Sequence, residues 1–165
     1  DPKNPQTKPI LFICHEFFDA MPAMIFAYSQ MGWVEKLVGK TPASLVDQNK
    51  KLFQFMDSEA NCKSVRTILK PERIFDREAR EEIQLGGKIE VQPKSLILMN
   101  SFAELISKIG GAVLNIDYGD DCAFSDSVRG ISGHKFIEKA EDLLEVPGKA
   151  DISAYVNFLA LAEVA

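Results

Sequence analysis

The stretch Pro93–Asp121, which reads PKSLILMNSFAELISKIGGAVLNIDYGDD, decides the fold class. Apolar residues recur in it at the three- and four-residue spacing of one helix face: Leu98, Met99, Phe102, Leu105, Ile106 and Ile109. Pro93 suits a first helical turn, and Gly110-Gly111 predicts the helix end. Residues 112–116 then predict a buried strand, which an acidic loop follows. Helix, tight turn, strand and loop together indicate one repeat of a doubly wound α/β sheet.

A second buried strand is predicted at Pro9–Cys14. Its sequence, PILFIC, is continuously apolar, which is typical of a parallel strand covered on both faces. Pro22 ends any regular element beyond that strand. Segments 23–28 and 33–38 flank a short connection with a glycine, which predicts a hairpin, and residues 51–56 are expected to add a third strand.

Residues 57–87 are less regular. Helices are predicted at 64–69 and 76–85, separated by Pro71. The charge run at 76–82 is interpreted as a solvent-facing helix surface with local charge pairs. A short strand is predicted at Lys88–Val91, directly before the long helix.

Composition excludes several classes of protein. The chain has 165 residues, 46% hydrophobic and 26% charged, with a net charge of -5. These values fit one soluble domain or part of a larger one. An acidic chain is a poor nucleic-acid platform and a poor ligand for anionic lipid, so we expect neither partner. No apolar run is long enough for a membrane span, no membrane insertion is expected, and no signal or transit segment is visible.

Cofactor and metal motifs are also missing from the sequence. It contains no GxGxxG, Walker or GxSxG motif, so we expect that the chain cannot hold a nucleotide-type cofactor unaided. Its two histidines lack ligand spacing, and no metal site is predicted. The three distant cysteines, Cys14, Cys62 and Cys122, favour a reducing compartment or buried thiols over disulfides. Both ends of the sequence resemble cut ends, so we expect the chain to be part of a longer protein.

Candidate functional residues follow the two buried strands. Ligands bind outside the carboxyl ends of parallel strands. His15, Glu16 and Asp19 follow the first strand, and Asp117 follows the second with Asp120 and Asp121. A structural role stays open for each of them, since the acids can cap turns and a lone histidine commonly makes a structural hydrogen bond. His134 has the same two interpretations.

Several blocks of the chain resemble one known family. HEFFDAMP at 15–22 resembles the (N/H)EFFDALP signature of the MidA-like family of S-adenosylmethionine-dependent methyltransferases, which includes a mitochondrial arginine methyltransferase that assists complex I assembly. Further blocks match in the family's order: GWVE at 32–35, EVQP at 90–93, GGAVLNIDYG at 110–119, RG at 129–130, HK at 134–135 and PGKADIS at 147–153.

The resemblance implies a partial class I (Rossmann-like) methyltransferase sheet with an inserted β-hairpin at about residues 23–56. Residues 1–165 would form the central part of one methyltransferase domain, without the N-terminal glycine motif that binds S-adenosylmethionine and without the C-terminal strands. The complete protein would use S-adenosyl-L-methionine, which this fragment would bind poorly. The resemblance also implies a protein substrate or a mitochondrial complex subunit as partner, and a mitochondrial location.

The roles of individual residues follow from the same resemblance. An arginine substrate is always charged, and carboxylates pair with its planar fork. Glu16 and Asp19 are therefore expected to be catalytic and to grip the guanidinium, with His15 against the cofactor. Asp117 and Tyr118 would shape the substrate side, with His134 as a more distant substrate-site partner.

Three departures from the family pattern leave an alternative open. Ala23-Met24 replaces a usual Val-His, Asn157 replaces a usual aspartate, and Asn115 lies in a strand that is normally apolar. A catalytically inactive relative, kept as an assembly or scaffold protein in a larger mitochondrial complex, would tolerate such changes. Methylation of a small molecule or of another residue type is a third, weaker functional hypothesis.

Overall fold

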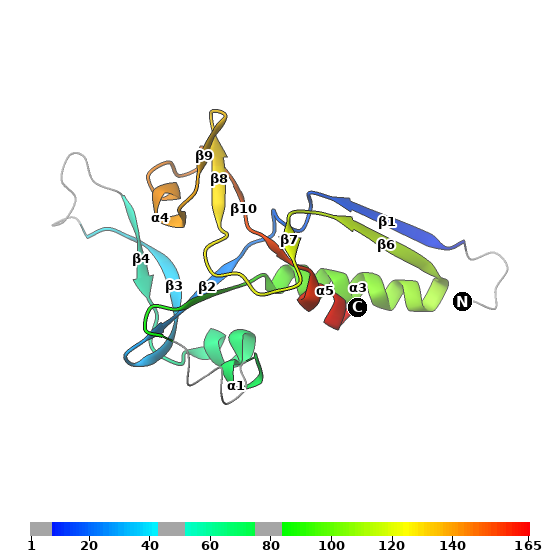
Figure 1. The fold of residues 1–165 in the computed structure, drawn as a ribbon, viewed down its shortest axis with the longest axis horizontal. Coiled ribbons are helices and arrows are strands. Elements are labelled where there is room, and N and C mark those ends of the chain that lie inside the picture. The colour runs from blue at the N-terminus through cyan, green and yellow to red at the C-terminus, as the bar shows by residue number, and fades with distance from the viewer. Residues whose placement is uncertain (1–7, 43–51, 75–83) are drawn as a thin grey trace. The chain divides into compact units, whose positions relative to one another are not determined.

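The computed structural model describes residues 8–42, 52–74 and 84–165 (Figure 1). The chain forms two compact units. The first unit combines Asp1–Pro22, Gln92–Ala123 and Ala154–Ala165, and the second combines Ala23–Val91 and Phe124–Ser153. Each unit therefore draws together segments that are distant in the sequence. Within the described ranges, no helix has both the length and the apolar character that crossing a membrane requires.

The first unit is built on a parallel strand pair. Strand β1 (Ile10–His15) pairs with β6 (Gly111–Ile116) in the register Ile10↔Gly111 through His15↔Ile116. This pairing confirms that the two apolar runs belong to one sheet. A second, shorter parallel pair joins β7 (Gly119–Asp120) to β11 (Val156–Asn157), which leads into α5 (Phe158–Val164). Gly119 is needed there, because a Cβ atom would collide with the carbonyl oxygen of Val156.

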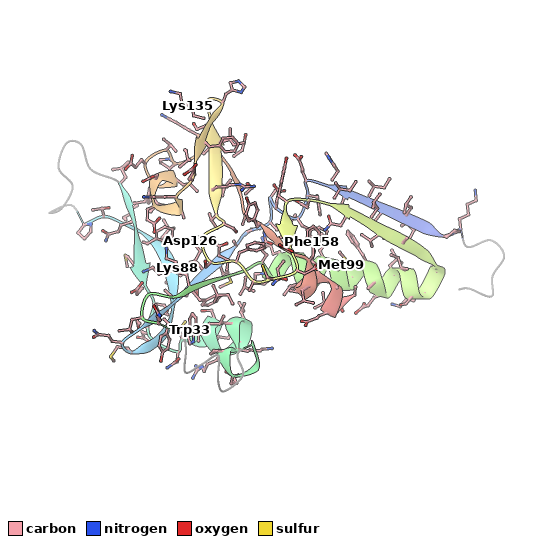
Figure 2. All side chains as sticks on the ribbon, viewed as in Figure 1. Trp33, Lys88, Met99, Asp126, Lys135 and Phe158 are labelled. Atoms are coloured by element: carbon pink, nitrogen blue, oxygen red, sulfur yellow. The ribbon has the colours of Figure 1, made fainter. Side chains whose placement is uncertain are left out.

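Helix α3 (Pro93–Ile109) covers one face of the parallel pair, as the apolar spacing predicts (Figure 1). The rings of Phe12 and Phe102 stack with centroids 4.1 Å apart. The buried core of this unit consists of Cys14, Phe18, Met99, Val156 and Leu161. Figure 2 labels Met99 and Phe158 where α3 meets α5; Met99 belongs to this core, and Phe158 is partly buried and packs against it. Burial of these side chains provides the main free energy that holds helix and strands together.

The prediction that both strands are covered on both faces is wrong for the described residues. The face opposite α3 is exposed: Leu11 61%, Ile13 65%, Leu114 49% and Ile116 48%. A continuous apolar run shows that both faces of a strand are hydrophobic, but burial also requires a layer on each side. The sequence pattern reported the first property and could not report the second.

The second unit is an antiparallel sheet in the order β4-β3-β2-β5. The strands are β2 (Met24–Ser29), β3 (Gly32–Lys40), β4 (Phe53–Asp57) and β5 (Lys88–Val91). Strands β2 and β3 form the predicted hairpin, with Tyr28 opposite Trp33, and β4 adds the predicted third strand. Strand β5 pairs antiparallel with β2 and brings the chain to the start of α3.

Smaller elements complete the second unit. A π-helical turn, η2 (Val65–Leu69), occupies the first helix predicted in the irregular region and leads into α1 (Pro71–Ile74). The charge run at 76–82, and all but the last two residues of the helix predicted at 76–85, fall outside the described residues. A three-stranded sheet, β10-β8-β9, consists of Asp151–Ser153, Arg129–Ser132 and Lys135–Ile137, and α4 (Ala140–Leu143) precedes β10. The core of this unit is Phe26, Trp33, Val65, Leu69 and Ile89.

Candidate functional site

The carboxyl ends of β1 and β6 form one edge of the parallel pair. His15 lies opposite Ile116 in the register, and the next amide, that of Glu16, donates to the Ile116 carbonyl over 2.9 Å. The polar residues that follow each strand therefore start at neighbouring positions. This placement confirms that both acidic strand ends belong to a common edge of one sheet.

Asp117 organises the turn that follows β1. Its Oδ2 accepts hydrogen bonds from three consecutive backbone amides, those of Phe17 at 3.0 Å, Phe18 at 2.9 Å and Asp19 at 3.2 Å. Its Oδ1 accepts from the amide of Tyr118 at 2.9 Å. Consecutive amides that point to one place make an anion-binding concavity, and here the protein fills that concavity with its own carboxylate. Asp117 thus acts on the shape of the turn.

Glu16 has an unusual backbone conformation at this edge. Its φ of 46° lies in the left-handed region, which is uncommon for a residue other than glycine. Its side chain is exposed, and its Oε1 accepts a hydrogen bond from the Tyr118 hydroxyl over 3.3 Å. A disfavoured conformation persists only where its surroundings impose it, and such residues cluster at functional sites.

Other contacts hold the same turn from behind. The Gln92 side-chain amide donates to the carbonyls of Phe18 at 3.1 Å and Met21 at 3.3 Å. The Ala154 amide donates to the Asp19 carbonyl at 2.9 Å, and the Phe18 side chain is fully buried. Sequence reasoning gave Gln92 no role of its own: it quoted the residue only within the EVQP block, where a polar residue lies between a strand and the proline that opens a helix.

The structure places five of the six predicted site residues at this edge. Glu16, Asp19, Asp117 and Tyr118 belong to one strand-end turn and its partner loop, and His15 is exposed at the last position of β1. His134 belongs to the second unit, in the β8–β9 turn, where it is exposed with a φ of 62°. The catalytic, cofactor and substrate roles assigned to these residues stay predictions.

Cys14 lies directly behind this edge and is buried. Burial, and then the negative charge of Asp117, raise the pKa of the Cys14 thiol. The thiol is therefore protonated at neutral pH and is a poor nucleophile. Among the described residues, no group of three histidine, cysteine or acidic side chains is placed to hold a metal ion.

Asn157, one of the departures from the family pattern, caps helix α5. Its Oδ1 accepts a hydrogen bond from the Ala160 amide over 2.9 Å. Asparagine and aspartate cap helices about equally well, so this replacement preserves the local structure. Asn115 differs, because both polar atoms of its side chain are buried without a hydrogen-bond partner among the described residues.

Comparison with known proteins gives a consistent result. Residues 2–165 match a family described as "Putative S-adenosyl-L-methionine-dependent methyltransferase". The chain is 32% identical over 155 residues to the protein arginine methyltransferase NDUFAF7, mitochondrial, of Danio rerio, and 29% identical over 154 residues to that of Homo sapiens. These matches cover 94% and 93% of the chain but 32% and 30% of the relatives, so the chain spans about a third of their length.

The fold is also found in solved structures. A protein of Burkholderia thailandensis, described as a "likely methyl transferase" bound to S-adenosyl-homocysteine, matches with a TM-score of 0.64 and 20% sequence identity. The match covers 97% of this chain and 38% of that one. A second structure from the same organism gives a TM-score of 0.66. At this level of identity the likeness establishes a shared α/β fold.

Proposed function

Because this chain belongs to the family of S-adenosyl-L-methionine-dependent methyltransferases, we propose that it forms the substrate side of an enzyme that methylates arginine side chains of proteins. The relatives named above are protein arginine methyltransferases, which supports arginine as the acceptor. The partner is then a protein substrate or a mitochondrial complex subunit. The relatives' mitochondrial names support the same location for this protein.

One observation carries the proposal. The exposed carboxylate of Glu16 lies at the carboxyl edge of the parallel strands, held by a left-handed backbone and by the Tyr118 hydroxyl. Ligands of open parallel sheets bind at this edge. A guanidinium carries five N–H donors in a rigid fork and pairs well with a carboxylate. These features support Glu16 as the residue that binds the arginine, and Asp19, from the same turn, is proposed as its second acidic contact.

The residues at this edge act by positioning the substrate guanidinium. Asp117 fixes the turn through three backbone amides, so Glu16 and Asp19 keep their places without a ligand. When bound, the cofactor supplies an electrophilic methyl group. Two carboxylates that hold the guanidinium in line with that group lower the entropic part of the barrier and stabilise the positive charge of the acceptor. His15, exposed at the end of β1, is the residue proposed to contact the cofactor.

The proposed fold is more specific than the α/β architecture that this chain shares with the solved structures. We assign β1 and β6 to the central part of a class I, Rossmann-like sheet, and residues 23–56 to a β-hairpin insertion. In this assignment residues 1–165 form the central part of one methyltransferase domain. The sequence contains no GxGxxG turn, so the chain alone is expected to bind S-adenosylmethionine weakly.

The test uses the full-length protein that contains this chain. Glu16→Gln keeps the shape of the side chain and removes its charge, and we expect a roughly 100-fold lower rate of arginine methylation with unchanged cofactor affinity. Mass spectrometry of methylated protein substrate gives the rate, and calorimetry gives the cofactor affinity. Glu163→Gln, at an exposed position of α5, is the matched control. A wild-type rate in the Glu16 variant would refute the assignment.

A further inference from the structure

Phe17 follows Glu16 directly and exposes an aromatic ring at the carboxyl edge of the parallel pair. Its side chain is 39% exposed, whereas the next residue, Phe18, is fully buried. A single exposed apolar side chain is ordinary on a protein surface, so the position of Phe17 matters more than its exposure. That position is beside an exposed carboxylate, at the edge where open parallel sheets bind their ligands.

Hydrogen bonds position the backbone that carries this ring. The amides of Phe17 and Phe18 donate to Oδ2 of Asp117 at 3.0 and 2.9 Å. The Oδ1 atom of the same carboxylate accepts from the amide of Tyr118 at 2.9 Å, and the Tyr118 hydroxyl donates to Glu16 at 3.3 Å. Phe17 and Tyr118 are therefore held at one carboxylate, and Tyr118 links them to the Glu16 side chain.

The Phe17 ring is supported by the core and keeps an open face. Its centroid lies 5.3 Å from that of the Phe18 ring, at an interplanar angle of 79°. In such an edge-to-face pair one ring presents its edge to the face of the other, which is a favourable arrangement of their quadrupoles. Phe18 therefore covers at most one face of the Phe17 ring, and it anchors that ring from a fully buried position.

A carboxylate next to an aromatic ring meets both needs of a guanidinium. The edge of a guanidinium carries N–H donors that pair with a carboxylate, and its flat face stacks on an aromatic ring. A lysine ammonium pairs with the carboxylate as a point charge and has no flat face to stack. The neighbours Glu16 and Phe17 thus combine the two chemistries that separate an arginine from a lysine.

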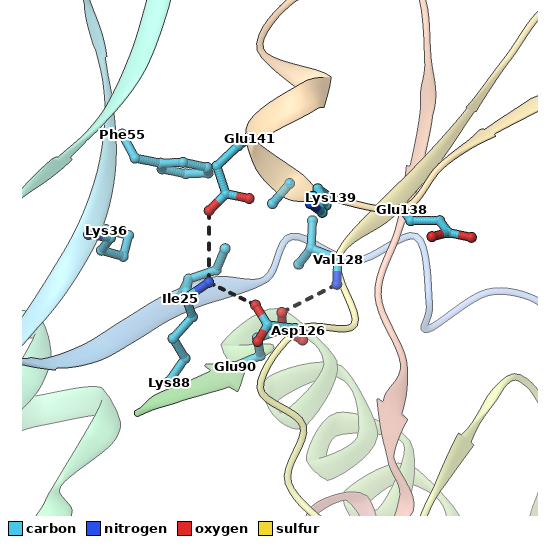
Figure 3. Close-up of a pocket in the computed structure, with 11 residues that line it drawn as sticks. Ile25, Lys36, Phe55, Lys88, Glu90, Asp126, Val128, Glu138, Lys139 and Glu141 are labelled. Atoms are coloured by element: carbon cyan, nitrogen blue, oxygen red, sulfur yellow. Dashed lines mark hydrogen bonds and ion pairs between the residues drawn. The ribbon is translucent and has the colours of Figure 1, made fainter. Parts of the chain in front are cut away.

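A cavity in the second unit provides a contrast. Figure 3 shows that Phe55 and the carboxylate of Glu141 also line one space there. Lys88 lies 2.8 Å from Asp126 and 3.8 Å from Glu141, so these carboxylates already have a cation of the protein. Among the described residues, no cationic side chain forms an ion pair with Glu16. Of the two places, the strand edge is the one that leaves a carboxylate beside a phenylalanine for an external cation.

We propose that Phe17 selects the acceptor side chain: its ring stacks on the arginine of the substrate while the Glu16 carboxylate binds the edge of the same guanidinium. The inference rests on the proposed function and adds to it the residue that distinguishes arginine from lysine. Phe17 contacts the substrate and takes no part in the bond changes at the methyl group. A cation stacked on an exposed ring gains a factor of about two to five in affinity.

The test introduces 4-fluorophenylalanine at position 17 of the full-length protein that contains this chain, so that fluorine NMR reports on the ring itself. The capped tripeptide acetyl-Gly-Arg-Gly-amide should shift this signal with a dissociation constant on the order of millimolar. The same peptide with lysine should bind about threefold more weakly, and with citrulline, the neutral isostere of arginine, about tenfold more weakly. A fluorine label at Phe136, which is 72% exposed in the second unit, is the matched control and should not shift.

Further fluorination at position 17 separates stacking from shape. Two and then three fluorine atoms withdraw negative charge from the ring face and change its size little, so the affinity for the arginine peptide should fall stepwise, by about fivefold in total. Phe17→Leu should weaken binding by a similar factor, Phe17→Tyr should restore it, and Phe136→Leu should leave it unchanged. Urea midpoints establish that each variant is folded, and the fluorinated series keeps the ring in place if Phe17→Leu is not.

Three results would overturn the role of Phe17. They are an affinity that ignores fluorination, equal binding of the arginine, lysine and citrulline peptides, and a Phe17→Leu variant that loses affinity for S-adenosylmethionine in place of the peptide. The last result would assign the ring to the cofactor. All three leave the rate loss expected for Glu16→Gln untouched, whereas a wild-type rate in Glu16→Gln removes the proposed function itself. The two proposals therefore fail in different measurements.

Discussion

Asp117 in the first unit and Glu90 in the second perform the same task in different ways. Each carboxylate collects three donors from a segment distant in sequence: Asp117 binds the amides of Phe17, Phe18 and Asp19, and Glu90 binds Ser127 twice and Val128 once. Asp117 holds a turn in which Glu16 and Phe17 are exposed and Phe18 is buried. Glu90 holds a loop whose Ser127 is only 6% exposed.

The difference separates two uses of an acidic residue. Asp117 shapes the turn at the carboxyl edge of the parallel pair, and Glu90 fastens the loop that carries Ser127 and Val128 against β5. In each unit the carboxylate that gathers donors from a distant segment has an architectural role. Four measurements test this comparison.

The largest effect is expected for Glu90→Ala. It leaves the buried Ser127 hydroxyl and two amides without their acceptor, and we expect the free energy of unfolding to fall by about 3 kcal/mol. Urea denaturation measures the change, with Glu104→Ala on the exposed face of α3 as control. A loss below about 1 kcal/mol would show that Glu90 is dispensable for holding the loop.

Asp117→Ala should cost less, about 2 kcal/mol, because the amides it releases are more exposed and water replaces part of the lost bonding. Hydrogen exchange should accelerate at Phe17, Phe18 and Asp19, and stay unchanged at Ser127 and Val128. Asp121→Ala, at an exposed neighbouring position, is the control. Equal acceleration in both units would contradict the separate roles of the two carboxylates.

Asn115→Val is expected to stabilise the first unit, in contrast to the two preceding variants. The variant removes two buried polar atoms that have no partner among the described residues, so we expect a gain of about 1 kcal/mol in the free energy of unfolding. Thermal and urea unfolding measure it, and Asn100→Val on the exposed side of α3 should give no such gain. A destabilised Asn115 variant would mean that the side chain has a partner in solution.

The smallest effect is a pH dependence of the second unit. The pKa of Lys88 is raised in the folded state, mainly by the hydrogen bond to Asp126, so its contribution to stability is complete below the unfolded value of about 10.4. That contribution is lost as the pH rises through the higher folded value. Urea midpoints across this alkaline range should therefore fall more steeply for wild type than for Lys88→Gln. Parallel curves would show that the ion pair adds no stability.

The amino-acid sequence predicted several of the local elements and part of their pairing. Continuous apolar runs predicted β1 and β6, the three- and four-residue spacing predicted α3, and a glycine between two apolar segments predicted the β2–β3 hairpin. These features depend on neighbours in the chain, so short-range patterns reveal them. The signature 15–22 also predicted the family, because several specific blocks matched in order.

The structural roles of the acidic residues depend on tertiary contacts. Asp117 binds amides about 100 residues away, and Glu90 binds a loop 37 residues away. Nothing in the local sequence of either residue records such a partner, since hydrogen bonds between distant segments form only when the chain folds. The same reason explains why the sequence assigned Gln92 no role of its own, and why strands that are apolar on both faces are covered on one.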